Sequence, residues 1–188
     1  RYIGISISPE QYRDIKSYTD EFIAKNAPLF DARIKGGRIK DCHGDLHAAH
    51  ICFTNGICIY DCIEFNDRFR YCDVASEVAF LAMDLDYHGY PHLARYFVEA
   101  YVDISGDREL PELLDFYKCY RAYVRGKVES FKLDDPHIPE EDKEVALGAA
   151  RRYFALAHCC ARGSRPLLLI TTGLMGTGKT VLSQTLAE

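Results

Sequence analysis

After residue 73, apolar side chains recur at spacings of three and four residues through most of the chain, which is typical of α-helices with one buried face. Turn signals at Gly89-Tyr90-Pro91 and Asp134-Asp135-Pro136 interrupt this pattern. The pattern therefore predicts a series of helices, with Asp73 as a plausible N-cap of the first. A second helix is expected to carry Leu93 to Ile104. A third is expected to start near Pro111, and a fourth near Pro139.

A separate helix is predicted near the start of the chain. Ser8 suits the N-cap, Pro9 suits the first helical position, and Gln11 is placed for a capping box. We expect this helix to run to about Arg33 and to stop at Gly36-Gly37.

Between these helical regions the pattern changes to short apolar runs and polar loops. Residues 38–41 look like a short strand, and two further apolar runs flank Thr54-Asn55-Gly56. Asn-Gly between apolar runs is the strongest short-range signal for a β-hairpin. Polar loops are predicted before the hairpin, at residues 43–50, and after it, at residues 61–71. The predicted fold class is α+β and mostly helical, with the chemistry on the loops.

The last part of the chain carries a glycine-rich motif. Residues 173–180 fit the pattern G-x-x-x-x-G-K-[ST] throughout. The apolar run at 166–172 predicts a buried strand before the motif, and 181–188 predicts the opening of a helix after it. In this context the backbone N–H groups and the helix N-terminus face phosphates. The residues expected to bind nucleotide are Gly173, Gly176, Gly178, Lys179 and Thr180.

This motif would open a second, α/β domain that is truncated here. The chain starts at Arg1 and stops inside the predicted helix, so we expect an interior segment of a longer protein. The expected organisation is a first domain at 1–162, a linker at 163–165 and the start of a P-loop domain at 166–188.

Composition narrows the possible partners. The 188 residues carry a net charge of −5, which gives no reason to expect a nucleic-acid partner, and no apolar run approaches the length of a membrane span. The eight cysteines include no C-x-x-C pair, which favours reduced thiols in a cytoplasmic protein. Zinc binding by cysteines is the alternative, although such sites usually show paired ligands at short spacing.

The candidate chemistry lies at the two ends of the predicted hairpin. The polar loop that contains Asp45 and His50 comes directly before it, and Asp61 comes directly after it. Because a hairpin brings its ends together, these three residues are expected to be neighbours. Two carboxylates at one place need a compensating cation, and a divalent metal with a phosphate is one natural solution.

These residues resemble the catalytic segment of the aminoglycoside phosphotransferase family, small-molecule kinases with the protein-kinase fold. The resemblance is carried by H-G-D-x-H at 43–47, by the hairpin with Asp61, and by Tyr71-Cys72-Asp73-Val74-Ala75, which is similar to the family's Y-D-x-A helix start. It implies a kinase-like C-lobe for residues 1–162, without its N-lobe. The whole chain resembles bacterial two-domain proteins that join such a domain to a P-loop kinase or ATPase domain.

The resemblance implies an ATP-dependent phosphotransferase that acts on a hydroxyl of a small molecule and uses Mg²⁺. Asp45 would be the catalytic carboxylate that accepts or orients the hydroxyl proton, and Asp61 would hold Mg²⁺ at the ATP phosphates. His43 and Asp73 would be supporting residues, with Asp73 alternatively only an N-cap. The segment alone, without the N-lobe and most of the P-loop domain, is expected to be inactive.

His50 departs from the family pattern. It stands where the family usually has an asparagine as second metal ligand, and an imidazole is a poorer ligand for Mg²⁺ than an oxygen. This departure supports an alternative function, a catalytically weak kinase-fold module that binds or regulates the P-loop partner. His43, His47 and His50 with Asp45 also permit a zinc or iron hydrolase, although their spacing does not match H-E-x-x-H.

His47 and a row of basic residues are expected to have structural roles. Local hydrogen bonds are expected to satisfy His47. A basic stripe at helical spacing is expected to be a solvated helix face, and it consists of Lys118, Arg121, Arg125 and Lys132.

Overall fold

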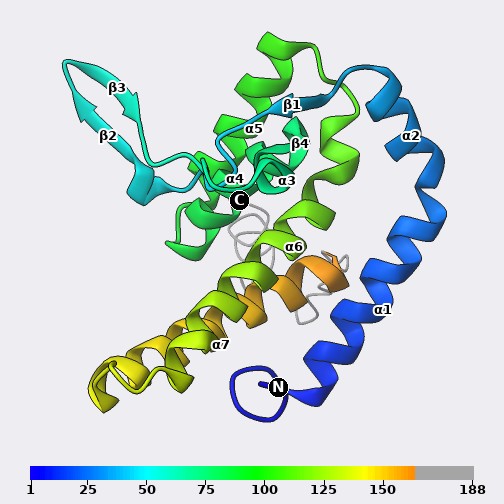
Figure 1. The fold of residues 1–188 in the computed structure, drawn as a ribbon. Coiled ribbons are helices and arrows are strands. Elements are labelled where there is room, and N and C mark those ends of the chain that lie inside the picture. The colour runs from blue at the N-terminus through cyan, green and yellow to red at the C-terminus, as the bar shows by residue number, and fades with distance from the viewer. Residues whose placement is uncertain (164–188) are drawn as a thin grey trace, which may run out of the picture.

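The computed structural model describes residues 1–163 and shows a mostly helical chain with two small antiparallel sheets (Figure 1). The predicted α+β class is therefore confirmed for this part of the chain. The predicted nucleotide-binding residues lie outside the described residues, and they are Gly173, Gly176, Gly178, Lys179 and Thr180.

The helices are α1 (Pro9–Lys25), α2 (Ala27–Lys35), α3 (Asp67–Arg70), α4 (Val74–Tyr87), α5 (Pro91–Ser105), α6 (Leu110–Phe131) and α7 (Glu140–Arg162), with 3₁₀ turns η1 (Ala48–His50) and η2 (Lys132–Asp134). The strands are β1 (Ile39–Asp41), β2 (Ile51–Thr54), β3 (Gly56–Ile59) and β4 (Tyr71–Asp73). None of the described helices combines the length and the apolar character that crossing a lipid bilayer requires.

The first helix begins as predicted and ends earlier than predicted. The Ser8 hydroxyl accepts from the Gln11 N–H at 3.1 Å and the Gln11 side chain accepts from the Ser8 N–H at 3.0 Å, so the capping box is present. The prediction of a single helix to Arg33 is wrong, because helix α1 ends and helix α2 begins at Asn26. Pro28 explains the break, since proline has no N–H to donate and its ring clashes with the preceding turn.

The predicted hairpin is confirmed, and a second sheet accompanies it. β2 and β3 pair antiparallel, with Cys52 opposite Cys58. β1 pairs antiparallel with β4, a strand that the sequence pattern does not predict. This pairing sets Ile39 opposite Asp73, so the strand that leads into loop 43–50 lies beside the start of α4. Figure 1 shows β2 and β3 projecting from the helical body, whereas β1 and β4 lie close to it.

α4 lies at the centre of the hydrophobic core. Every residue from Ala75 to Asp84 is buried. One part of this helix packs against Val98 of α5 and Leu113 of α6, and another part packs in the cluster that contains Phe154 of α7. Gly126 of α6 allows α7 to approach closely, because a Cβ there would lie 2.9 Å from the Phe154 ring.

A buried arginine joins three distant segments. The Arg33 guanidinium donates to the Asp73 carboxylate at 2.6 and 2.7 Å and to the Asp107 carboxylate twice at 2.8 Å. Asp73 also accepts from the Ala75 N–H at 2.8 Å, which makes it the N-cap of α4 as predicted. All three charged side chains are almost fully buried. The hydrogen bonds from Arg33 hold the pKa of Asp107 below its usual value.

Arg33→Met should lower the free energy of unfolding by about 3–5 kcal/mol, because it leaves two buried carboxylates without their partner. Urea unfolding followed by circular dichroism measures this loss. The lowered pKa of Asp107 adds a pH dependence: its contribution is present at neutral pH and is lost as the pH falls through the folded-state pKa. The stabilities of wild type and variant should therefore approach each other in acid.

Lys16→Met is the matched control for this prediction. Lys16 forms an ion pair with Asp20 on the surface of α1, and exposed ion pairs contribute little to stability. A loss at Arg33 no larger than the loss at Lys16 would contradict the role given to the buried network.

Candidate functional site

Two acids of α4 hold the loop between β1 and β2. The Glu77 carboxylate accepts hydrogen bonds from the backbone N–H groups of His43, at 2.9 Å, and Gly44, at 3.2 Å. Further along the same helix, the Asp84 carboxylate accepts from the Ala48 N–H at 2.9 Å. The backbone of this loop is therefore fixed on α4 at both ends.

Arg121 of α6 completes this support. Its guanidinium donates to the Gly44 carbonyl at 3.0 Å and to the Ser76 hydroxyl at 3.1 Å, and it lies 4.6 Å from the centre of the Phe80 ring. Burial raises the pKa of Glu77, and the charge of Arg121, 3.9 Å away, opposes that shift. The predicted solvated face is wrong at this position, because Arg121 is buried and takes part in the support of the loop.

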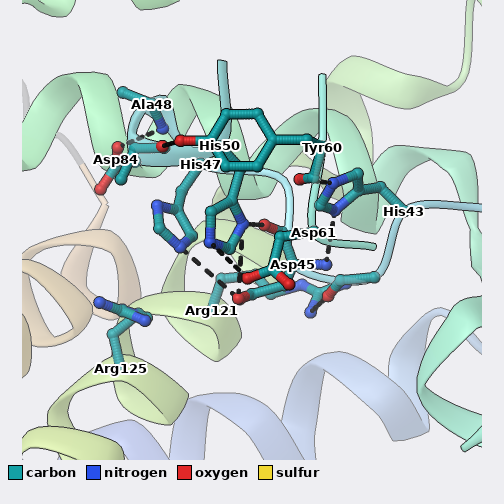
Figure 2. A network of polar contacts seen from close by, with 12 residues as sticks. His43, Asp45, His47, Ala48, His50, Tyr60, Asp61, Asp84, Arg121 and Arg125 are labelled. Atoms are coloured by element: carbon teal, nitrogen blue, oxygen red, sulfur yellow. Dashed lines mark hydrogen bonds and ion pairs between the residues drawn. The ribbon is translucent and has the colours of Figure 1, made fainter. Parts of the chain in front are cut away.

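Gly44 stands at a position that other residues do not fit. Its φ of +84° is a left-handed conformation that favours glycine. A Cβ there would lie 3.0 Å from the Phe69 carbonyl oxygen and 3.1 Å from the Ile63 side chain. This tight turn comes directly before Asp45, whose side chain lies among the histidines of the loop (Figure 2).

The His43 ring links the backbone of Asp45 to the end of the hairpin. Its Nε2 donates to the Tyr60 carbonyl oxygen at 2.7 Å, because a carbonyl oxygen can only accept. Nδ1 of the neutral ring then carries no proton and accepts from the Asp45 N–H at 3.3 Å. These two contacts fix the tautomer of His43 and suit the supporting position that the sequence suggests for it.

Asp45 and Asp61 flank His50. Nδ1 of His50 donates to the Asp45 carbonyl oxygen at 2.9 Å and lies 3.7 Å from the Asp45 carboxylate, while Nε2 lies 3.3 Å from Oδ2 of Asp61. The neighbourhood predicted from hairpin closure is therefore confirmed (Figure 2). Within residues 1–163, Asp61 is also the one non-glycine residue with a positive φ, +64°. Aspartate tolerates this left-handed conformation better than most residues.

His47 faces Asp45 as well, so the local partner expected for it is a carboxylate two residues away. Its Nε2 lies 3.5 Å from an Asp45 carboxylate oxygen, and its ring centre lies 4.0 Å from that of His50. His47 lowers the pKa of Asp45, and the charge of Arg125 acts in the same direction against the effect of burial. One ligand atom from each of Asp45, His47 and His50 lies within 4.8 Å of the other two.

Asp45 and Asp61 line one cleft with a volume of about 1210 Å³. Its walls combine aromatic side chains with positive ones, including Arg125 and Lys127 of α6. Nε of Arg125 is buried and has no hydrogen-bond partner among residues 1–163. The cleft therefore offers carboxylates to a cation and the positive charges of Arg125 and Lys127 to an anion.

Other candidate residues lie around this group. Asp73 borders the cleft, and its carboxylate is engaged both as N-cap and as partner of Arg33. All eight cysteines are free. Cys42, Cys72 and Glu77 form a second group whose ligand atoms lie within 4.8 Å of one another, which is the cysteine arrangement that a metal could use.

Comparison with known sequences finds uncharacterised proteins of Mycobacterium tuberculosis and Mycobacterium bovis that are 38% identical to this chain over 183 residues. The match covers 97% of this chain and 36% of each relative, so the chain spans about a third of the relatives' length. Because the relatives are uncharacterised, the similarity transfers no activity. No protein-family profile and no solved structure matches the chain.

Gly44→Ala should lower the free energy of unfolding by more than about 1 kcal/mol, because the turn requires a positive φ and leaves no room for a Cβ. Gly148→Ala is the matched control. Gly148 lies in α7 with open space around its Cα, so alanine there should stabilise the protein by about 0.5–1 kcal/mol. Urea unfolding measures both, and effects of the same sign would contradict the described turn.

Proposed function

We propose that this chain carries the catalytic segment of an ATP-dependent phosphotransferase that acts on a hydroxyl of a small molecule. The convergence of Asp45 and Asp61 on His50, at the base of the hairpin and on one cleft, carries the proposal. The resemblance to aminoglycoside phosphotransferases in H-G-D-x-H supports the same chemistry. In finer terms, we propose a protein-kinase-like C-lobe at 1–162 and a P-loop domain that begins at 166.

In this proposal Asp45 acts on the acceptor hydroxyl. His47 and Arg125 favour its charged form by lowering its pKa, and a charged carboxylate can accept or orient the hydroxyl proton. Phosphoryl transfer depends largely on positioning and on neutralisation of charge. The backbone support that Glu77 and Arg121 give to the Asp45 loop meets the first of these needs.

The residues suit a divalent cation, and they suit Mg²⁺ only in part. Asp61 supplies carboxylate oxygens, the ligands that Mg²⁺ prefers, and its side chain is 75% exposed. His50 supplies a nitrogen where the family has an amide oxygen, which is a poorer match for Mg²⁺. A cation held here with ATP would neutralise charge on the phosphates.

The cleft also has groups that suit phosphate. Arg125 and Lys127 line the cleft and bring positive charge to it. Preorganised positive groups stabilise the charge that develops on a phosphoryl group during transfer. The side chains of one cleft therefore cover both requirements, a carboxylate for the hydroxyl and cations for the phosphate.

His50 favours a second candidate function, a catalytically weak kinase-fold module that binds or regulates a P-loop partner. If the ring of His50 carries a second proton, it forms a direct ion pair with Asp61 across 3.3 Å. That pair would compete with Mg²⁺ for the Asp61 carboxylate. The same fold would then bind a partner without efficient transfer of phosphate.

In the full-length protein, Asp45→Asn should slow phosphoryl transfer by at least about 100-fold, the lower end of what a general base contributes. ATP consumption measured across a panel of small hydroxylated metabolites tests this. All proteins in the comparison carry Lys179→Ala, so that the predicted P-loop adds no turnover of its own.

Asp20→Asn changes an exposed aspartate of α1 and should leave the rate unchanged. His50→Asn restores an oxygen ligand and should raise the rate in Mg²⁺. Equal rates for Asp45→Asn, His50→Asn and the parent would reject the phosphotransferase in favour of the regulatory module.

A further inference from the structure

The contact between His50 and Asp61 brings two hydrogen-bond acceptors together. Because Nδ1 of His50 donates to the Asp45 carbonyl oxygen, Nε2 of the neutral ring carries a lone pair. That lone pair lies 3.3 Å from a carboxylate oxygen of Asp61. Two acceptors at this distance repel each other unless positive charge lies between them. A cation bound at this point would remove that repulsion.

The distances leave room for a cation. Charge-assisted hydrogen bonds between nitrogen and carboxylate oxygen are about 2.7–2.9 Å long. The contacts of His50 with Asp61, at 3.3 Å, and of His47 with Asp45, at 3.5 Å, are both longer. Two ligands that each lie about 2.0–2.1 Å from a tetrahedral ion are about 3.3–3.4 Å apart, which is close to both contacts. Adjacent ligands of an octahedral Mg²⁺ would be about 2.9 Å apart.

We propose that Asp45, His47 and His50, whose ligand atoms lie within 4.8 Å of one another, bind a borderline transition-metal ion, represented by Zn²⁺ and Co²⁺, in preference to Mg²⁺. Asp61, beside Nε2 of His50, would add a further carboxylate. Two imidazoles with two carboxylates suit such ions, whereas Mg²⁺ prefers oxygen ligands in octahedral geometry. The catalytic role of this ion rests on the proposed function, because the same residues would hold the cation that the phosphotransferase uses. Ion binding itself requires neither ATP nor transfer.

The surroundings of His50 agree with this assignment, and the ring of His47 is held by packing. Histidines that ligate metals almost always donate their other ring N–H to a carbonyl or a carboxylate, and Nδ1 of His50 does so to the Asp45 carbonyl oxygen. The His47 side chain is only 10% exposed, and its ring lies 5.9 Å from the Phe80 ring centre. Its orientation toward Asp45 is therefore set by packing before any ion binds.

The test is calorimetric titration of the metal-free chain with Zn²⁺, Co²⁺ and Mg²⁺, without nucleotide. One equivalent of Zn²⁺ or Co²⁺ should bind, and more tightly than Mg²⁺. Four-coordinate Co²⁺ should also give strong visible absorption bands, which six-coordinate Co²⁺ lacks. A thiolate-to-cobalt absorption band in the near ultraviolet would place the ion at cysteines such as Cys42 and Cys72, and would overturn the proposal.

Asp61→Asn and His50→Asn should each weaken Zn²⁺ binding by at least about 10–100-fold, the range for loss of an outer-shell partner. The Asp61→Asn variant is expected to keep the fold, because the side chain is exposed and asparagine tolerates the left-handed backbone conformation. His137→Ala changes an exposed histidine in the turn before α7 and should bind Zn²⁺ as the parent does.

Zn²⁺ binding no tighter than Mg²⁺ binding, or unchanged in both site variants, would overturn the metal assignment. ATP turnover in Mg²⁺ is measured separately, on the full-length protein. Turnover by the full-length protein without a preference of the chain for Zn²⁺ would contradict only this inference. Binding of Zn²⁺ by the chain without turnover by the full-length protein would contradict only the phosphotransferase.

Discussion

The buried guanidinium of Arg33 is the constraint on which the rest of the described structure depends. Removing such a charge from water costs several kcal/mol, and only a complete set of partners offsets that cost. Asp73 and Asp107 supply this set through four hydrogen bonds. Because Asp73 also caps α4, the position of Arg33 decides where α4 begins. One ionic group thus joins α2, the start of α4 and the segment between α5 and α6.

The candidate site depends on the position of α4, because residues of this helix hold the loop that carries Asp45. Glu77 lies one turn after the cap, and its carboxylate is buried, which raises its pKa and makes partners necessary. The N–H groups of His43 and Gly44 and the charge of Arg121 are those partners. The loop needs acceptors for its N–H groups, and the helix needs donors for its carboxylate. Each satisfies the other, and the turn before Asp45 is fixed as a result.

The features that the sequence predicted correctly depend on near neighbours along the chain. The capping box at Ser8, the Asn-Gly hairpin and the cap at Asp73 are local hydrogen-bond patterns. The proximity of Asp45, His50 and Asp61 follows from closure of that hairpin. The break at Asn26 also has a local signal in Pro28. Burial of Arg121 had none, because helical spacing does not show that Gly44 and Glu77 supply its partners.

The choice of histidine at position 50 can be separated from the requirements of the fold. The loop backbone is held by Glu77, Asp84 and Arg121, and none of these contacts involves the His50 ring. An asparagine amide N–H could replace the Nδ1–H that reaches the Asp45 carbonyl, and its oxygen could take the place of Nε2. The two side chains thus offer the same donor to the loop. They differ in the atom that faces Asp61, nitrogen in one case and oxygen in the other. Because ligand type governs which cation a site prefers, this position acts on the ion more than on the fold.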